Sequence, residues 1–129
     1  MKQKKKKLKK KLFSEKLKNG DVILLQHLAT GKFLHSHLHA SPLTNQQEVS
    51  AYEGGDSGDN WQLLLQGDSW KSDSQIRLKH VDTGRFLQCS SATYGNPIPG
   101  QHEIAASTGG TPAIWTAAEG IYFPLLQQQ

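Results

Sequence analysis

The sequence predicts an all-β domain made of two similar units. Three blocks of residues return in the same order about 53 to 55 positions later. Short apolar or alternating runs lie between loops rich in Gly, Ser, Asp, Asn and Pro, and no sustained helical period follows residue 18. A repeat of this length is one supersecondary unit that cannot bury its apolar face alone. The matched blocks are Gln26–Leu34 with Lys79–Leu87, Asn45–Ala51 with Gly100–Ala106, and Trp61 with Trp115.

Each unit is expected to begin with a β-hairpin. An apolar strand run meets a Thr-Gly turn, in which glycine adopts positive φ without steric cost, and a Phe-Leu pair then starts the returning strand. In the first unit these are Val22–Leu25, Thr30-Gly31 and Phe33-Leu34. In the second unit they are Ile76–Leu78, Thr83-Gly84 and Phe86-Leu87.

Two further strands complete each unit. Glu48–Tyr52 and Glu103–Ala106 alternate polar and small apolar residues, as half-buried strands do. Trp61–Leu65 and Ile114–Thr116 supply the fourth strand of their units. The sequence therefore predicts about eight strands in two four-stranded units. The expected organisation is a basic extension at 1–18, repeat A at 19–68, repeat B at 69–126 and a short tail at 127–129.

Charge is strongly segregated along the chain. Ten of the fifteen Lys and Arg residues lie between Lys2 and Lys18, whereas residues 19–129 carry five basic against ten acidic residues. We expect the Lys-rich extension to be disordered or weakly helical, because its apolar residues form a poor amphipathic stripe. The acidic body does not suit nucleic acid, so only weak binding through Lys2–Lys18 is expected.

The single cysteine, Cys89, excludes an intrachain disulfide, and we expect a buried, inert thiol. No run approaches the roughly 20 apolar residues of a membrane span. The sequence as written also has no signal peptide and no retention ending, which by itself predicts a cytosolic protein.

Several motifs resemble a known family. Leu34–His37, Ser41–Leu43 and Asn45–Tyr52 are similar to the MIR motif of protein O-mannosyltransferases, inositol trisphosphate receptors and ryanodine receptors. Within this group the sequence resembles the stromal-cell-derived-factor-2-like proteins most. Tyr94–Glu103 and Ala118–Tyr122 are similar to the last repeat and the terminus of that subfamily. The resemblance covers about residues 20–124.

The resemblance implies a β-trefoil-like fold in which about two of three four-stranded repeats are present. Members of that family carry three MIR repeats, a secretory signal and usually an endoplasmic-reticulum retention ending. This chain matches the second and third repeats, and its basic extension occupies the place of the first. We expect either an incomplete or alternatively started form, or self-association that fills the missing place.

The resemblance also implies a function in endoplasmic-reticulum protein folding, quality control and the unfolded protein response. Relatives act with a luminal Hsp40 and Hsp70 on unfolded clients, without a cofactor. The first alternative is a carbohydrate-recognising module for O-mannosyl or mannose ligands, linked to protein O-mannosylation. The second is a cytosolic or nuclear protein that binds RNA or anionic lipid through its Lys-rich extension.

The sequence does not favour catalysis or a metal. No nucleophile elbow, paired acids or phosphate loop is recognisable, and the acidic loop Glu53–Asp59 lacks the closing Glu of a calcium loop. His35, His37 and His39 alternate, a spacing open to Zn²⁺ or Ni²⁺. No Cys or acid lies at obvious ligand spacing beside them, and the resemblance implies no metal, so we expect none.

The candidate binding residues fall in the repeated motifs. Amide and carboxylate groups beside aromatic residues suit sugar hydroxyls or extended backbone, although in β-trefoils the same groups often pin loops to the strands. Trp61 and Trp115 are expected in the core, whereas Trp70 lies between the repeats and is expected to be accessible. The candidates are His35, Ser36, His37, Gln46, Gln47, Glu48, Gln101, His102, Glu103 and Trp70.

Overall fold

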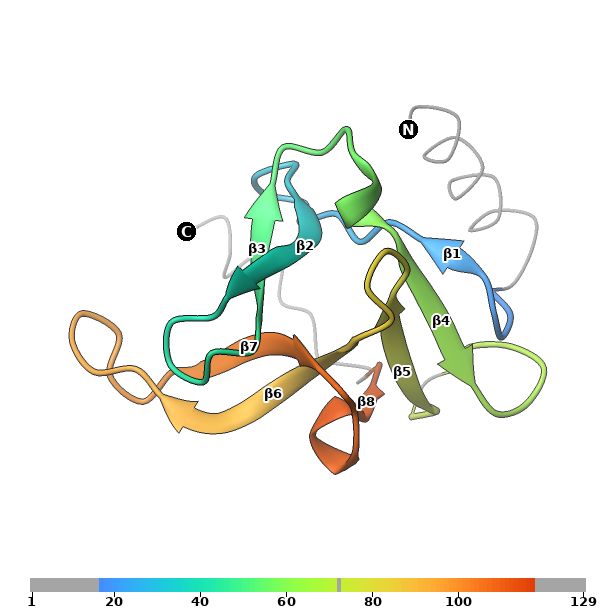
Figure 1. Cartoon of the computed structure of the whole chain (residues 1–129). Helices are drawn as coiled ribbons and strands as arrows, with labels where there is room; N and C mark the ends of the chain where they lie inside the picture. Colours follow the sequence, from blue (N-terminus) through green and yellow to red (C-terminus); the bar gives the residue numbers. More distant parts are fainter. Residues whose placement is uncertain (1–16, 72, 118–129) are drawn as a thin grey trace, which may run out of the picture.

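The computed structural model of the chain describes residues 17–71 and 73–117, and it is all-β (Figure 1). The predicted extension at 1–18 therefore lies almost wholly outside the described residues, as do the tail at 127–129 and the segment Ala118–Tyr122. The described residues form eight strands and two short 3-10 helices. They are β1 (Val22–Ile23), β2 (Phe33–Ala40), β3 (Gln47–Tyr52), η1 (Ser57–Asp59), β4 (Trp61–Leu65), β5 (Gln75–His80), β6 (Phe86–Thr93), β7 (His102–Ser107), η2 (Thr111–Ala113) and β8 (Trp115–Thr116).

The two units follow the same register. Phe33 pairs with Tyr52 in β2–β3, and Phe86 pairs with Ser107 in β6–β7. Both pairings shift at the same place, between Ser36 and Ala40 in repeat A and between Cys89 and Thr93 in repeat B. The sequence repeat is therefore a structural repeat down to its irregularities.

All strands belong to one antiparallel sheet of eight strands. The order is β1-β4-β5-β6-β7-β3-β2, and β8 pairs with β5 off this path. The repeats are joined twice, by β4–β5 and by β3–β7. Figure 1 shows that the sheet is strongly curled, so that the β2–β3 and β6–β7 hairpins stand apart from the β4–β5 pair.

The core lies between the strands that join the repeats. β4 and β5 alternate buried and more exposed residues, as the pleat of a half-buried sheet requires. Trp61 is fully buried, which confirms its predicted place in the core, and Trp115 is half-buried against that core. The buried cluster contains Ile23, Trp61, Leu63, Leu65, Ile76, Leu78 and Leu87.

Three side chains differ from their expected environments. Leu17, which falls within the predicted extension, packs against the core, and its carbonyl accepts a hydrogen bond from the Trp70 amide at 3.0 Å. Trp70 is itself half-buried against the core, so only part of its indole is accessible. Cys89 is half-buried where we expected a buried thiol, and it is the last paired residue before β6 shifts register.

The predicted Thr-Gly turns close the first hairpin of each unit. Gly31 and Gly84 have φ values of 72° and 73°, in the left-handed region that favours glycine. The amides of Gly31 and Gly84 donate to the carbonyls of His27 and His80 at 2.8 and 2.7 Å. Among the described residues, no helix is long and apolar enough to cross a membrane.

Candidate functional site

Two histidines and two aspartates from separate segments meet beside the β2–β3 hairpin. His35, on β2, is buried, and its Nδ1 lies 2.7 Å from Oδ1 of Asp59, a fully buried carboxylate at the end of η1. A carboxylate only accepts hydrogen bonds, so the proton of this contact belongs to His35 Nδ1. The second oxygen of Asp59 accepts from the Gly55 amide at 3.0 Å. The imidazole of His35 is therefore held in one orientation.

His37 stands next to His35 because residues two apart on a strand face the same side. The two Nε2 atoms are 2.6 Å apart, and the rings meet nearly at right angles with centroids 4.1 Å apart. Asp56 approaches both rings, with Oδ2 3.7 Å from His37 Nε2 and Oδ1 3.6 Å from His35 Nδ1. His37 and Asp56 are 50% and 42% exposed, so the cluster opens to solvent. His39 lies further along, with its ring 6.2 Å from that of His37.

The η1 loop approaches β2 closely because of Gly58. A Cβ added at Gly58 would lie 2.6 Å from Cε1 of His35 and 2.7 Å from the Ser36 carbonyl oxygen. Asp56 caps η1, and its Oδ1 accepts from the Gly58 amide at 2.8 Å. The sequence predicted only a solvated acidic loop here, since nothing in the spacing shows that Asp56 and Asp59 return to the histidines. The Asp-Ser-Gly-Asp sequence is typical of a tight turn, and this is the local signal that could have indicated how the loop folds.

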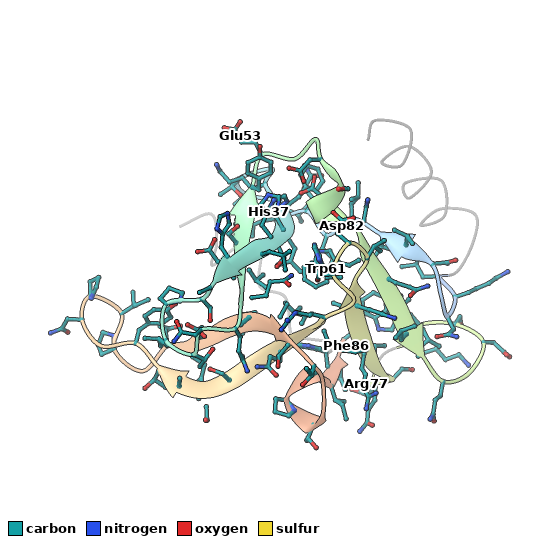
Figure 2. All side chains as sticks on the ribbon, viewed as in Figure 1. His37, Glu53, Trp61, Arg77, Asp82 and Phe86 are labelled. Carbon is teal, nitrogen blue, oxygen red and sulfur yellow. The ribbon has the colours of Figure 1, made fainter. Side chains whose placement is uncertain are left out.

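A cavity of about 320 Å³ adjoins this cluster. It lies between the β2 strand of repeat A and the Thr-Gly turn of repeat B, and Figure 2 shows His37 and Asp82 on the same side of the molecule, near buried Trp61. The η1 loop also reaches this turn, because the Ser57 hydroxyl donates to Asp82 at 2.5 Å. The lining residues are Ser36, His37, Leu38, His80, Asp82 and Thr83.

Glu103 forms a second polar cluster, between the repeats. Its buried carboxylate, on β7, accepts hydrogen bonds from the loop that follows β2. The donors are the hydroxyls of Ser41 and Thr44, at 2.8 and 2.5 Å, and the amides of Leu43 and Thr44, at 2.6 and 3.3 Å. Burial by itself raises the pKa of the Glu103 carboxyl, but these hydrogen bonds, that of the Thr44 hydroxyl foremost, favour the charged form more strongly and lower the pKa overall.

The two glutamines of the repeat A block also make internal contacts. Gln47 is buried, and its amide donates to the hydroxyls of Ser36 at 2.7 Å and Thr83 at 3.0 Å. Gln46 donates to Ser107 at 3.3 Å and accepts from the amide of Gln88. The contacts with Thr83, Ser107 and Gln88 join repeat A to repeat B.

The remaining candidate residues of the Gln-containing motifs face solvent. Glu48, Gln101 and His102 are exposed, and Nδ1 of His102 lies 2.7 Å from the carbonyl of Ser90. The structure thus brings His35, Ser36 and His37 together with Gln47 near one cavity. It places Glu103 in a separate interface between the repeats, and Trp70 against the core.

Comparison with known proteins agrees with this architecture. The sequence profile of the MIR domain matches residues 4–92. The stromal cell-derived factor 2-like protein of Dictyostelium discoideum is 48% identical over 113 residues, which cover 83% of this chain and 53% of that protein. The chain therefore spans about half the length of the curated relatives it matches.

Solved structures share the fold. The crystal structure of the SDF2-like protein from Arabidopsis thaliana aligns with a TM-score of 0.77 and 40% identity, over 84% of this chain and 63% of that one. The S. cerevisiae protein O-mannosyltransferase Pmt1-Pmt2 complex bound to the sugar donor aligns with a TM-score of 0.72 and 28% identity, over 79% of this chain and 17% of that one. The chain therefore belongs to the MIR domain family, and within it resembles the stromal cell-derived factor 2-like proteins.

Proposed function

We propose that this protein is a non-enzymatic accessory factor in protein folding and quality control in the endoplasmic reticulum. It binds unfolded clients together with a luminal Hsp40 and Hsp70. The observation that carries the proposal is the 42 to 48% identity to stromal cell-derived factor 2-like proteins across more than four fifths of the chain. The luminal location and the chaperone partners follow from that resemblance.

Exposed apolar side chains offer a means of holding clients. Leu28, in the first hairpin turn of repeat A, is 95% exposed, and Val81 occupies the equivalent turn of repeat B and is also exposed. Leu38, on β2 beside the histidine cluster, is 78% exposed. Contact with such side chains removes apolar surface of an extended client from water, which favours a reversible complex. The mechanism needs no nucleotide or cofactor.

The test combines a client assay with a partner assay on the full chain. Light scattering follows the aggregation of a thermally unfolded enzyme, and affinity isolation asks whether a luminal J-protein binds. The proposal predicts suppressed aggregation and J-protein capture, both weakened by L28S combined with V81S. The exposed polar variant Gln66→Ala is the control and leaves both unchanged. A folded chain that neither suppresses aggregation nor captures a J-protein would rule the function out.

A second candidate function is recognition of O-mannosyl or mannose ligands. It is favoured by the structural match to an O-mannosyltransferase complex bound to its sugar donor. Glu48, Gln101 and His102 are the members of the repeated block that remain exposed for hydroxyl groups, whereas Gln47 and Glu103 are buried. Titration with mannose, followed by amide NMR shifts, should move signals near Gln101 and His102. A flat titration excludes this function.

A further inference from the structure

We propose that His35, His37 and Asp56 bind a divalent cation, with zinc as the ion that their chemistry fits. One ligand atom from each of these residues lies within 4.8 Å of the others. Two imidazoles and one carboxylate are nitrogen and oxygen donors of the kind that zinc accepts in four-coordinate sites. This site is independent of the proposed function. It also removes one of the two grounds on which we expected no metal, because an acid does lie beside the histidines in space.

Asp59 prepares His35 for a metal. Its buried carboxylate holds His35 Nδ1 at 2.7 Å, which leaves the lone pair of Nε2 directed toward His37. A carboxylate behind a ligating histidine sets its tautomer and orientation in metal sites and raises its basicity. Asp59 therefore acts as a positioning residue, and the Gly55 amide at 3.0 Å fixes its other oxygen.

The spacing of the two imidazoles is close to that of a metal site. The Nε2 atoms are 2.6 Å apart, a distance at which the Nε2–H of His37 donates a hydrogen bond to Nε2 of His35. A zinc ion bonded to both at about 2.0–2.1 Å, with a tetrahedral angle, separates them by about 3.3 Å. The His37 side chain is half exposed, so its ring can open by this amount without disturbing the core.

Asp56 supplies the third ligand from the η1 loop. Its Oδ1 is held by the Gly58 amide at 2.8 Å, while Oδ2 faces His37 Nε2 at 3.7 Å. The solvent side of the cluster leaves room for water as a fourth ligand. Binding would tie the η1 loop to β2, two segments otherwise linked by the contact between His35 and Asp59.

Untagged full-length chain titrated with Zn²⁺ in a calorimeter tests the site, and Co²⁺ substitution reports its geometry through visible absorption bands. We expect one zinc per chain, tetrahedral-type cobalt bands and a raised Tm. H37Q and D56N should each weaken zinc binding at least tenfold. H39Q, on the same strand but further along, should bind zinc like the unchanged protein.

Both ligand variants replace exposed side chains, and circular dichroism verifies that they fold. If one of them unfolds, the other still tests the site. The proposal is overturned if the unchanged protein binds no zinc. It is equally overturned if H37Q and D56N bind zinc with unchanged affinity, or if H39Q alone abolishes binding, which would indicate surface histidine binding only.

Discussion

Equivalent residues of the two repeats have different environments, and Glu48 and Glu103 show this most clearly. Both follow the same Gln-containing motif and lie on equivalent strands, β3 and β7. Glu103 is buried because the loop after β2 in repeat A covers it. Glu48 is exposed, and no such loop covers it among the described residues. The same substitution at these two positions therefore compares a buried and an exposed glutamate within one molecule.

Replacing Glu103 with Gln should lower the free energy of unfolding at pH 7 by about 1–3 kcal/mol, because buried donors lose a charged acceptor. Glu48→Gln should change the free energy of unfolding by less than about 0.5 kcal/mol, as exposed substitutions do. Urea denaturation of both variants measures the difference. Equal effects of the two substitutions would contradict the role assigned to Glu103.

The Glu103 carboxyl should also make the free energy of unfolding depend on pH in the acidic range. The pKa of Glu103 is lower in the folded protein than its ordinary value of 4.5, so folding favours the charged form. Its stabilisation is fully present above 4.5 and is lost as pH falls through the folded-state pKa. The gap between the unchanged protein and Glu103→Gln should therefore narrow below pH 4.5. Urea midpoints measured from pH 7 down to pH 3 would show whether this occurs.

At the scale of single residues, the sequence predicted which side chains repeat but not which environments they enter. Alternation indicated that His35 and His37 share a face, and the structure places their rings in contact. It could not indicate Asp56 and Asp59, because a loop returns them from about twenty residues away and only tertiary packing decides where they lie. Glu103 likewise depends on a partner loop some sixty residues earlier.

At the scale of elements, the repeats share a hydrogen bond made by an indole nitrogen. The indole nitrogen of Trp61 donates to the Leu34 carbonyl at 3.0 Å, and that of Trp115 donates to the Leu87 carbonyl at 2.9 Å. Each contact ties the fourth strand of a unit to the start of its second strand. The recurrence of Trp in the sequence therefore reflects one structural role performed twice.

Trp61→Phe should destabilise the protein more than Trp115→Phe. Both lose the same hydrogen bond, but only Trp61 is fully buried and leaves a cavity. We expect a loss of about 2–3 kcal/mol for Trp61→Phe and about 1 kcal/mol for Trp115→Phe. Urea denaturation of the two variants, followed by circular dichroism, measures both losses. A larger loss for Trp115→Phe would contradict this assignment of the core.

Element types were predicted better than element bounds. All eight strands were expected, yet β1 is only Val22–Ile23, whereas the strand begun by Phe33-Leu34 runs on to Ala40. The segment from His35 to His39 is polar and carries little strand signal of its own. Its two ends are held by β3, since His35 and Ser36 pair before the register shift and Ala40 pairs after it, so tertiary pairing overrides local propensity here. The 3-10 helices η1 and η2 were not anticipated either.

At the scale of the whole molecule, the sheet is open: its order begins at β1 and ends at β2, and the short strand β8 pairs beside β5. Within the described parts of the chain, β1 pairs only with β4 and β8 only with β5. A cavity of about 520 Å³ is lined mainly by the β4 and β5 segments, and Ile114, just before β8, is exposed at its edge. Unpaired strand edges and exposed apolar side chains favour contact with another chain.

We therefore expect the chain to self-associate through the surface around this cavity and Ile114. Sedimentation velocity should show a sedimentation coefficient that rises with protein concentration, and Ile114→Ser should reduce the rise. Leu28→Ser, which removes an exposed apolar side chain from the distant hairpin turn, is the control and should leave the association unchanged. A protein that stays monomeric at every concentration up to about 100 μM would contradict the expectation. Its dimerisation Kd would then exceed about 100 μM, which corresponds to a binding free energy of less than about 6 kcal/mol.

Client binding is the central claim, and fluorescence anisotropy with a labelled client tests it most directly. The client is prepared both permanently unfolded, by reduction and alkylation, and in its native form. Full-length chain should bind the unfolded form saturably and reversibly, bind the native form little, and lose affinity when Leu28 and Val81 are both replaced by Ser. No anisotropy change with a chain that circular dichroism shows to be folded, or equal binding of native and unfolded client, would contradict the claim.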